Sequence, residues 1–506
     1  MIDRGVIAFR VDASPVIGSG HVMRCLSLAR ALMNRGASAI FVTRAIPAPL
    51  RVLSEALGVK IAPMPATEPS EFNSDLAHGH WLGAAPEDDA AATLHALGKV
   101  SPAWLIVDHY GIDAHWHSFL RPHVQRIAVI DDLADRNHDC DVLIDANLSA
   151  VSERRYLTRT AETTALCLGP RYAMLRPEFA AKARELLRSF GEVGRILVSF
   201  GGFDVANHTK ISLQALEHCG FEGCVDVVVG QGHPEVQELT TMVGAKSNWS
   251  LHVQTLRMAD LMASADFAIG AGGTTVYERA CLGLPSLAIC AAGNQRAQLQ
   301  HAEAAGILTN VSPDSFSVEA LSKAIMGMIS VPDRLLEQSR KGSELVDGLG
   351  ADRIAKLLMA DGPITVRPAA IGDALTVLEW RNTEAVRMFS GDAAVIATQD
   401  HMVWFAKHLL SETCITLIGQ CEGEDCGVAR FDIEGETATV SIFLAPAFMG
   451  RGIGLNLLLV AERKLVGRLP KVKSCIGRVS AGNTASASMF FSAGYDQVEG
   501  LWCKRV

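Results

Sequence analysis

A strand, a glycine-rich turn and a helix follow one another at the start of this chain. The strand is the apolar segment 6–9, the turn is Gly18-Ser19-Gly20-His21, and apolar residues at helical spacing follow from Met23 to Leu32. Glycine lets the backbone approach a ligand closely, and the start of a helix offers free N–H groups to an anion. The order of these segments predicts a Rossmann-type unit in which His21 faces the bound ligand.

A second turn of the same kind occurs about 250 residues further along the chain. It runs from Gly270 to Thr275, follows an apolar segment that ends at Ile269, and leads into a helix that carries Glu278. This separation is too long for one mononucleotide-binding fold. We therefore predict an α/β protein with two Rossmann-like lobes that face each other across a cleft.

The composition favours a large globular protein with small-molecule partners. The chain has 506 residues, of which 49% are hydrophobic and 20% are charged, and this length suggests roughly three domains. A net charge of −9 argues against a nucleic-acid surface. We find no signal-like start and no apolar stretch long enough for a membrane helix, so we expect a cytoplasmic protein without membrane contact. The twelve cysteines are scattered, which favours reduced thiols. The oligomeric state stays open.

Changes in strand pattern divide the chain into three predicted domains. Strands alternate with helices through residues 1–155, the N-terminal lobe, and again through 156–350, the nucleotide-binding lobe. Several strands of the first lobe end in acidic residues, which a parallel sheet would bring to its ligand-binding edge. Asp361-Gly362-Pro363 looks like a boundary, and the strands of residues 364–506 read as antiparallel, typical of an α+β domain. The acidic strand ends are Asp108, Asp131, Asp132 and Asp145.

Two elements of the third domain indicate coenzyme binding. The turn from Met449 to Gly454 joins a strand to a helix, so it presents consecutive N–H groups to a pyrophosphate. Further along, Asn483, Ser486 and Phe490 are followed by Gly494-Tyr495. Such a turn alone is weak support, because ordinary tight turns look similar.

With both elements together, residues 364–506 resemble the GNAT acetyltransferases. The resemblance implies that acetyl-CoA is a co-substrate and that its acetyl group passes to an amine. Phe490 stands where many relatives have a tyrosine that protonates the departing thiolate, so the general acid is open, and we expect Tyr495 to lie in the core. The resemblance implies contacts of acetyl-CoA with Leu444, Arg451, Gly452, Gly454, Asn483, Ser486 and Phe490.

Residues 1–345 closely resemble the nucleotide-sugar hydrolases of pseudaminic acid synthesis. The resemblance rests on the segment from Arg10 to Arg24 and on motifs further along: Asp108-His109-Tyr110-Gly111, Asp131-Asp132-Leu133-Ala134-Asp135-Arg136, Leu168-Gly169-Pro170, Leu175-Arg176-Pro177-Glu178-Phe179, Phe200-Gly201-Gly202 and Gly283-Leu284-Pro285. It implies a GT-B-like fold and hydrolysis of UDP-2,4-diacetamido-2,4,6-trideoxy-β-L-altropyranose to the free sugar and UDP.

The resemblance also implies roles for individual residues. His21 would be the catalytic base, a role that suits a histidine near neutral pH. Glu278 would bind ribose hydroxyls. Substrate contacts are implied for Arg10, Asp12, Gly18, Gly20, Arg24, Asp108, Tyr110, Gly201, Gly202 and Asp204, and UDP contacts for Gly272, Gly273, Thr274, Thr275, Glu278, Asn294 and Gln295.

The two resemblances together imply a bifunctional enzyme. The third domain would acetylate UDP-4-amino-4,6-dideoxy-N-acetyl-β-L-altrosamine, and the two lobes would hydrolyse the product. We expect no metal, because the spacing of His109, His115 and His117 suggests loop and helix surface. His21 could also merely satisfy backbone groups at the helix start. The alternatives are a glycosyltransferase that uses a nucleotide sugar, and a third domain that binds CoA without catalysis.

Overall fold

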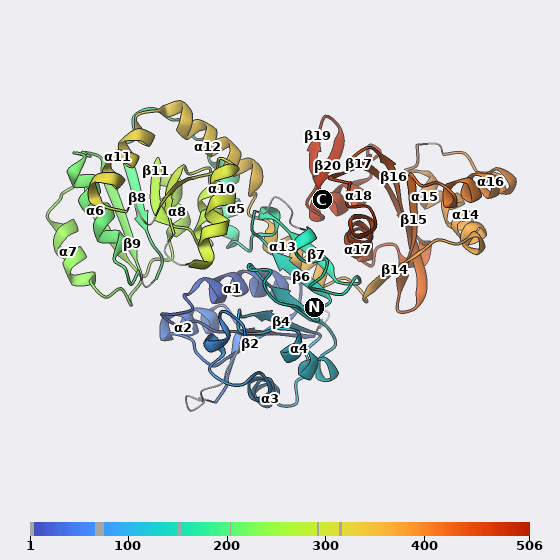
Figure 1. The fold of residues 1–506 in the computed structure, drawn as a ribbon, viewed down its shortest axis with the longest axis horizontal. Helices are drawn as coiled ribbons and strands as arrows, with labels where there is room; N and C mark the ends of the chain where they lie inside the picture. Colours follow the sequence, from blue (N-terminus) through green and yellow to red (C-terminus); the bar gives the residue numbers. More distant parts are fainter. Residues whose placement is uncertain are drawn as a thin grey trace.

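The computed structural model describes residues 5–65, 75–148, 153–202, 204–290, 293–312, 316–391 and 393–506. Figure 1 shows three sheets, each with its own helices: the first lobe in blue to teal, the second in green to yellow, and the third domain in orange to red. In the described part of the chain, no helix is both long and apolar enough to cross a bilayer.

The first lobe is a parallel sheet of seven strands in the order β3-β2-β1-β4-β5-β6-β7. Its inner strands are almost continuously apolar, because helices cover both faces of a parallel sheet. The strands are β1 (Val6–Val11), β2 (Ser38–Thr43), β3 (Lys60–Pro63), β4 (Trp104–Asp108), β5 (Ile127–Ile130), β6 (Val142–Asp145) and β7 (Ala165–Leu168), and the helices are α1 (Gly20–Met33), α2 (Ala48–Ala56), α3 (Pro86–Leu97) and α4 (Ala114–Leu120).

The second lobe is a parallel sheet in the order β10-β9-β8-β11-β12-β13. These two parallel sheets confirm the predicted pair of Rossmann-like lobes. The strands are β8 (Arg195–Ser199), β9 (Cys224–Val229), β10 (Trp249–Val253), β11 (Phe267–Ala271), β12 (Ser286–Ile289) and β13 (Thr309–Val311). The helices are α5 (Pro177–Glu185), α6 (His208–His218), α7 (Val236–Gly244), α8 (Met258–Ser264), α9 (Thr275–Cys281), α10 (Arg296–Ala304), α11 (Val318–Ile329) and α12 (Pro332–Leu345).

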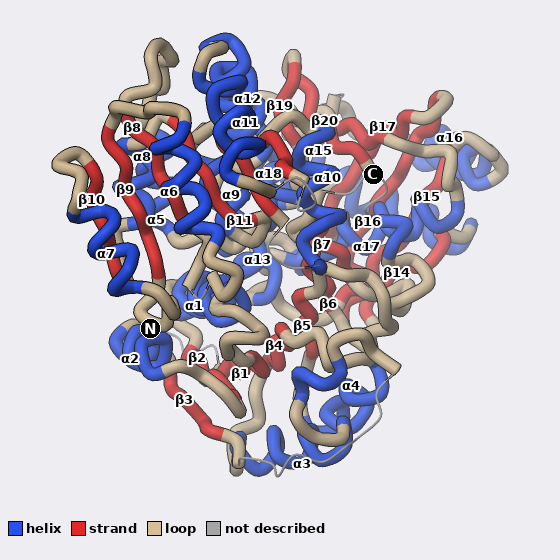
Figure 2. Tube along the Cα trace, turned by 60° about the vertical axis from the view of Figure 1, so that its left-hand side comes forward, coloured by secondary structure: helices blue, strands red, loops and turns tan. Residues whose placement is uncertain are grey.

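The third domain is a mixed sheet in the order β14-β15-β16-β17-β18-β20-β19 (Figure 2). Its neighbours pair antiparallel except β17 and β18, which pair parallel only from Thr437 to Val440 of β17. The strands are β14 (Ile364–Pro368), β15 (Cys414–Cys421), β16 (Glu424–Glu434), β17 (Thr437–Leu444), β18 (Ser474–Gly477), β19 (Asp496–Val498) and β20 (Leu501–Arg505), and the helices are α14 (Ala374–Asn382), α15 (Glu384–Arg387), α16 (Thr398–Leu409), α17 (Ile453–Arg468) and α18 (Thr484–Ser492).

The boundaries of the lobes differ from those expected at residues 155 and 350. Strand β7 completes the first sheet, so this lobe continues to Leu168. Helix α13 (Gly350–Leu358), which follows the second lobe in sequence, packs against α1 of the first lobe and also contacts α17. Trp104 Nε1 donates a hydrogen bond to Leu358 O at 2.7 Å. The residues before Asp361 are therefore a helix of the first lobe and not a free linker.

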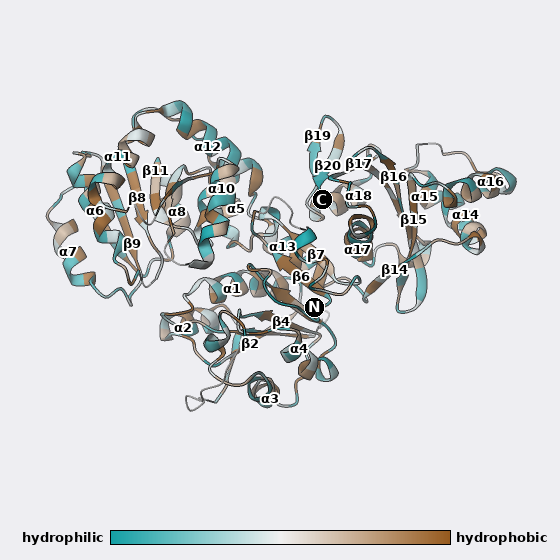
Figure 3. Ribbon diagram, viewed as in Figure 1, coloured by the Kyte–Doolittle hydropathy of each residue, from teal (hydrophilic) through white to brown (hydrophobic). Residues whose placement is uncertain are grey.

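The third domain shares a continuous apolar core with the first lobe. This core extends from α1 through α13 to α17 and the third sheet. Figure 3 shows the apolar residues concentrated on the strands, with more hydrophilic colouring on outer helices such as α12. Across the boundary, Arg463 donates to Thr160 Oγ1 at 2.7 Å, and Tyr172 Oη donates to Ser492 O at 3.1 Å. Helix α17 is thus buried between two sheets.

Candidate functional site

A buried histidine–aspartate pair lies at the carboxyl edge of the first sheet. His21, in the first turn of α1, donates from Nδ1 to Asp108 Oδ1 at 2.6 Å. Arg24, one turn later, donates to both oxygens of Asp108 at 2.7 and 2.6 Å. Burial alone would raise the pKa of Asp108, but the Arg24 guanidinium and His21 outweigh it and hold that pKa well below its usual value. The carboxylate therefore stays ionised and orients the imidazole.

Arg24 connects this pair to the next strand end. Its Nη1 donates to Asp132 Oδ2 at 2.5 Å, and the Tyr110 hydroxyl donates to the same oxygen. The Tyr110 ring meets the His21 ring edge-on at 4.7 Å between centroids. The structure thus brings together His21, Arg24, Asp108 and Tyr110, as the sequence predicted for one site.

Trp81 is a neighbour of this site that the sequence analysis did not single out. Its ring stacks on Tyr110, with 5.6 Å between centroids and 23° between planes. The His78 ring is tilted against the Trp81 ring, with 4.5 Å between centroids and 40° between planes. The signal that could have found them was the tryptophan that directly follows His78-Gly79-His80, since aromatic side chains commonly line small-molecule sites.

Arg10 and Asp12 lie beneath the site in a buried ion network. Arg10 pairs with Asp12 at 2.7 Å and with Asp89 at 2.8 Å, and it has no exposed surface. Asp12 also accepts from Thr43 Oγ1 at 2.9 Å and from the backbone N–H of Arg44 at 2.7 Å. Both side chains are thus bonded to other groups of the first lobe, and their predicted contact with the substrate stays a prediction.

The glycines of the second turn differ in how much space a side chain would have. A Cβ on Gly270 would lie 2.5 Å from Ser199 O, and one on Gly272 would lie 2.6 Å from Leu299 Cδ1, so packing within the lobe excludes any side chain there. The corresponding position on Gly273 has ordinary space, 3.6 Å from Gln295 Nε2. Packing within the lobe therefore does not explain Gly273, and a close approach of a ligand to its backbone stays a prediction.

The first turn lies directly against the second lobe. A Cβ on Gly20 would lie 3.7 Å from Thr274 Oγ1, and one on Gly202 would lie 3.6 Å from Ser19 Oγ. Gly18 has φ +85°, a left-handed conformation that favours glycine and turns the chain toward this contact. Both turns predicted to bind the nucleotide sugar therefore meet at the junction of the lobes.

Glu278 and Tyr277 follow at the start of α9, together with Thr275. Glu278 Oε1 lies 3.8 Å from Arg176 Nη2, and burial raises the pKa of its carboxyl group. Tyr277 bridges the lobes by donating to Asn147 Oδ1 at 3.1 Å. Gln295 and Asn294 lie in the short 3-10 turn Gly293–Gln295, and the side chain of Asn294 is outside the described part of the structure.

The residues that follow β8 make hydrogen bonds with neighbouring residues of the second lobe. Gly201 has φ +91°, and the Asp204 carboxylate accepts from the N–H of Thr209 at 2.8 Å and from its Oγ1 at 2.6 Å. It also accepts from the His208 N–H at 3.0 Å. Asp204, expected to contact the substrate, thus uses its carboxylate to cap the start of α6.

A cavity of about 1380 Å³ opens in the third domain where β17 and β18 part. Their pairing ends at Val440 and Gly477, and β17 continues alone to Leu444. Six of the seven residues expected to contact acetyl-CoA line this cavity: Leu444, Gly452, Gly454, Asn483, Ser486 and Phe490. The side chain of the seventh, Arg451, turns to Asp361 at 3.3 Å, which leaves only its backbone for the predicted contact.

Phe490 is packed against the strand beside it. The position of a Cβ on Gly477 lies 2.5 Å from Phe490 Cζ, and the ring contacts Tyr495 edge-on at 4.9 Å. Tyr495 is buried, and its hydroxyl donates to Glu462 Oε1 at 2.6 Å. The prediction that Tyr495 lies in the core is confirmed.

The far end of the cavity is lined by α14 and α16, and the sequence analysis did not reach these residues. Trp404 and Arg430 lie there together, with the guanidinium 5.1 Å from the ring centroid. Asp400, His401 and Arg381 line the same end. No short motif marks them, because they come from separate helices and a strand.

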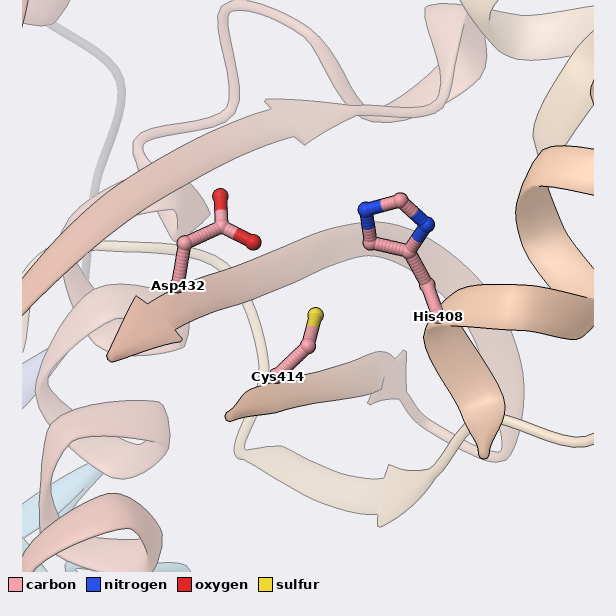
Figure 4. A group of neighbouring side chains, drawn as sticks. All are labelled: His408, Cys414 and Asp432. Atoms are coloured by element: carbon pink, nitrogen blue, oxygen red, sulfur yellow. The ribbon is translucent and has the colours of Figure 1, made fainter. Parts of the chain in front are cut away.

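Beside this end lie three side chains of metal-ligating type, His408, Cys414 and Asp432 (Figure 4). Their ligand atoms lie within 4.8 Å of one another. Asp432 already pairs with Arg430 at 2.9 Å, and burial raises the pKa of the Cys414 thiol to about 11. A metal at these three side chains would have to displace the Arg430 guanidinium from Asp432 and the proton from the Cys414 thiol. The three residues therefore already have partners or protons in place of a metal.

Comparison with known proteins finds sequence relatives of more than half of this chain, one of which is named as a UDP-sugar hydrolase. No family model matches the chain. An uncharacterized protein of Methanocaldococcus jannaschii is 26% identical over 286 residues, which cover 55% of this chain and 54% of that relative, so the match spans about half of the relative's length. The UDP-2,4-diacetamido-2,4,6-trideoxy-β-L-altropyranose hydrolase of Campylobacter jejuni is 23% identical over 290 residues, which cover 57% of this chain and 93% of the hydrolase.

Two solved structures resemble different parts of the chain. The calicheamicin glycosyltransferase CalG4 has a TM-score of 0.50 and 15% identity, covering 71% of this chain and 98% of that one. The aminoglycoside acetyltransferase AAC(6')-Ib with coenzyme A has a TM-score of 0.26 and 17% identity, covering 28% of this chain and 94% of that one. The chain thus has the two-lobed fold of CalG4, is similar in sequence to a UDP-sugar hydrolase over 57% of its length, and also contains an α+β domain with a sheet of its own.

Proposed function

We propose that the two lobes hydrolyse a UDP-sugar and that the third domain acetylates its precursor. The observation that carries the hydrolase is the His21–Asp108 pair, held at the junction where the turn of the first lobe meets Thr274 of the second. A general base on one side and a nucleotide-binding turn on the other are the two parts that hydrolysis of a nucleotide sugar requires.

In this mechanism His21 Nε2 takes a proton from water as the water attacks the anomeric carbon. The bond between that carbon and the UDP oxygen breaks, and UDP leaves with the electron pair. Because Nδ1 donates to Asp108, the other ring nitrogen is free to accept, and the ionised carboxylate stabilises the imidazolium that forms. Arg24 holds Asp108 in place through two hydrogen bonds.

Groups of the second lobe would stabilise the leaving UDP. The Gly272 N–H already donates to Ile289 O at 3.1 Å, so the following amides at the start of α9, from Gly273 to Thr275, are those available to the diphosphate. Glu278 would accept from ribose hydroxyls. The substrate that this proposal assigns is UDP-2,4-diacetamido-2,4,6-trideoxy-β-L-altropyranose, which the printed name of the Campylobacter relative supports.

For the third domain we propose acetyl transfer from acetyl-CoA to the 4-amino group of UDP-4-amino-4,6-dideoxy-N-acetyl-β-L-altrosamine. The neutral amine attacks the thioester carbonyl, the CoA thiolate leaves with the electron pair of the carbon–sulfur bond, and the nitrogen gives up one proton to water. A thiolate leaves without a dedicated acid more readily than an alkoxide, since thiols ionise near pH 8.5. The parted strands, the glycine turn and the cavity support this reading.

Product analysis of the purified full-length protein tests both steps. With the UDP-4-amino sugar and acetyl-CoA, we expect mass spectrometry and NMR to show free diacetamido sugar, UDP and CoA. Without acetyl-CoA, the UDP-4-amino sugar should stay intact. Release of free sugar in the absence of any acceptor separates hydrolysis from glycosyl transfer. If the ready-made diacetamido substrate is not cleaved, the hydrolase proposal fails.

Calorimetry with UDP tests the nucleotide site. Glu278→Gln keeps the shape of the side chain but removes its charge, so UDP should bind about tenfold more weakly, within the range of a charged hydrogen bond. Glu178→Gln is the matched control, because Glu178 also contacts Arg176, at 3.1 Å, but lies outside the turn. Equal UDP affinity of wild type and Glu278→Gln would place the ribose elsewhere.

A further inference from the structure

One lysine of the hydrolase body reaches the cavity of the third domain. Lys356 belongs to α13, which packs on α1 of the first lobe, yet its side chain lines the cavity. Its Nζ donates to Ser488 Oγ at 2.7 Å and to Ser492 Oγ at 3.4 Å, both on α18. Helix α18 also carries Ser486 and Phe490, which line the same cavity.

The residues just after α13 lie against the glycine turn expected to bind pyrophosphate. A Cβ on Gly452 would lie 3.5 Å from Ala360 Cβ, and Ala360 lies two residues beyond the end of α13 at Leu358. Lys356 and the turn both line the cavity, and Ala360, which lies against the turn, comes four residues after Lys356. The part of the cavity that contains Trp404 is lined by other elements, α14 and α16.

The charge of Lys356 is not matched by an acid. Among its described contacts are two serine hydroxyls and no carboxylate, whereas nearby Arg35 pairs with Asp352 at 2.8 Å. Burial, and then the positive charge of Arg35, lower the pKa of Lys356. A half-buried ammonium that lacks a counter-ion gains from an anion that enters its cavity.

We propose that Lys356 binds the 3'-phosphate of coenzyme A, so that a residue of the hydrolase body completes the cofactor site of the third domain. The inference rests on the proposed use of acetyl-CoA. CoA carries two kinds of phosphate at its nucleotide end. The amides of the turn from Gly450 to Gly454 would bind the pyrophosphate, and Lys356 would bind the 3'-phosphate. A lysine ammonium on a flexible side chain can reach such a phosphate as a single positive charge.

Calorimetry with CoA and with dephospho-CoA, which lacks the 3'-phosphate, tests this contact in the full-length protein. Wild type should bind CoA about tenfold more tightly than dephospho-CoA, and Lys356→Met should lose that preference while its affinity for dephospho-CoA stays the same. Lys356→Arg keeps the charge and should keep most of the preference. Lys473→Met is the matched control, because it removes an exposed lysine of the third domain that pairs with Glu436 outside the cavity.

The outcomes separate the possible failures. If Lys356→Met binds CoA as tightly as wild type, or loses both ligands equally, the assignment to the 3'-phosphate is overturned. If wild type binds neither ligand, the proposed acetyltransferase fails instead. Hydrolysis of ready-made diacetamido substrate and the thermal unfolding midpoint of each variant show whether α13 still packs on the first lobe, so that an affinity loss is not mistaken for unfolding.

Discussion

The strand-end site of the first lobe is a cluster of bonded charged side chains, whereas the site in the third domain is an open cavity. In the first, charged groups are bonded to one another: Arg24 alone joins Asp108 and Asp132, and His21 is fixed by Asp108. In the second, two strands part and leave about 1380 Å³ open. Activating one water requires charges fixed in advance, whereas transfer from a large carrier requires room for the carrier and the acceptor.

The two sites also differ in where their residues come from. The charged cluster comes from the ends of neighbouring strands of one sheet and from α1. The cavity takes residues from β17, α17, α18, α14 and α16, and from α13 of the first lobe. A site of the first kind depends on single side chains, and a site of the second kind depends on packing. The following experiments test this contrast, from the largest expected effect to the smallest.

His21→Ala should reduce hydrolysis by about two to four orders of magnitude, the usual range for loss of a general base. The measurement is the rate of UDP release from the diacetamido substrate. Acetyl transfer should continue, so the variant should accumulate the acetylated UDP-sugar. A near-normal rate of UDP release would remove His21 from the mechanism and with it the view that one side chain dominates this site.

Gly477→Ala should destabilise the third domain by about 1–3 kcal/mol, because the new methyl group would meet the Phe490 ring, whose Cζ lies 2.5 Å from that position. Thermal unfolding measures the effect, and acetyl transfer should fall with it. The control is Gly467→Ala on α17, where a Cβ meets no atom within 4 Å, so stability should rise slightly. Similar midpoints for both variants would mean that packing does not define the cavity.

Asp145→Asn should change how stability depends on pH. Burial and nearby Asp132 raise the pKa of Asp145 to about 7, against 3.8 in an unfolded chain. The folded protein therefore binds more protons than the unfolded chain between about pH 4 and 7, and this group's contribution to stability falls as pH rises through that window. In Asp145→Asn this falling contribution is absent, so the free energy of unfolding should rise with pH more steeply than in wild type. The two slopes should differ by up to about 1.4 kcal/mol per pH unit. Urea titrations of wild type and variant between about pH 4 and 7 give the free energy of unfolding at each pH. Equal slopes of the two free energies against pH would contradict the prediction.

Phe490→Tyr should alter acetyl transfer by less than about threefold, equivalent to about 0.6 kcal/mol in the barrier. The distal edge of the Phe490 ring faces Gly477, so a hydroxyl there has little room, and we propose that thiolate protonation is not rate-limiting. Single-turnover acetylation measures the effect. A large gain in rate would show that the natural domain lacks a needed acid, in favour of the alternative that it binds CoA without efficient catalysis.

The sequence analysis reached the charged cluster because its residues lie in recognisable local contexts. His21 follows a glycine turn, and Asp108 and Asp132 follow apolar strands, so a parallel sheet had to bring them to one edge. The family resemblance, and not this reasoning, placed Asp12 and Asp204 among the ligand contacts. In the structure the Asp12 carboxylate accepts from the Arg44 N–H and the Asp204 carboxylate accepts from the Thr209 N–H, because buried N–H groups require partners.

What the sequence determined by itself is the set of local units: the strand–turn–helix repeats of both lobes, the glycine turn of the third domain, and the histidine held at the start of α1. Hydrophobic periodicity and glycine positions act over short distances, so these units can be read directly. Only the tertiary structure decided that α13 returns to the first lobe, that β7 completes its sheet, and that Lys356 enters the cavity of another domain. These contacts join segments far apart in the chain, and they are selected by the burial of the shared apolar core, which no local pattern encodes.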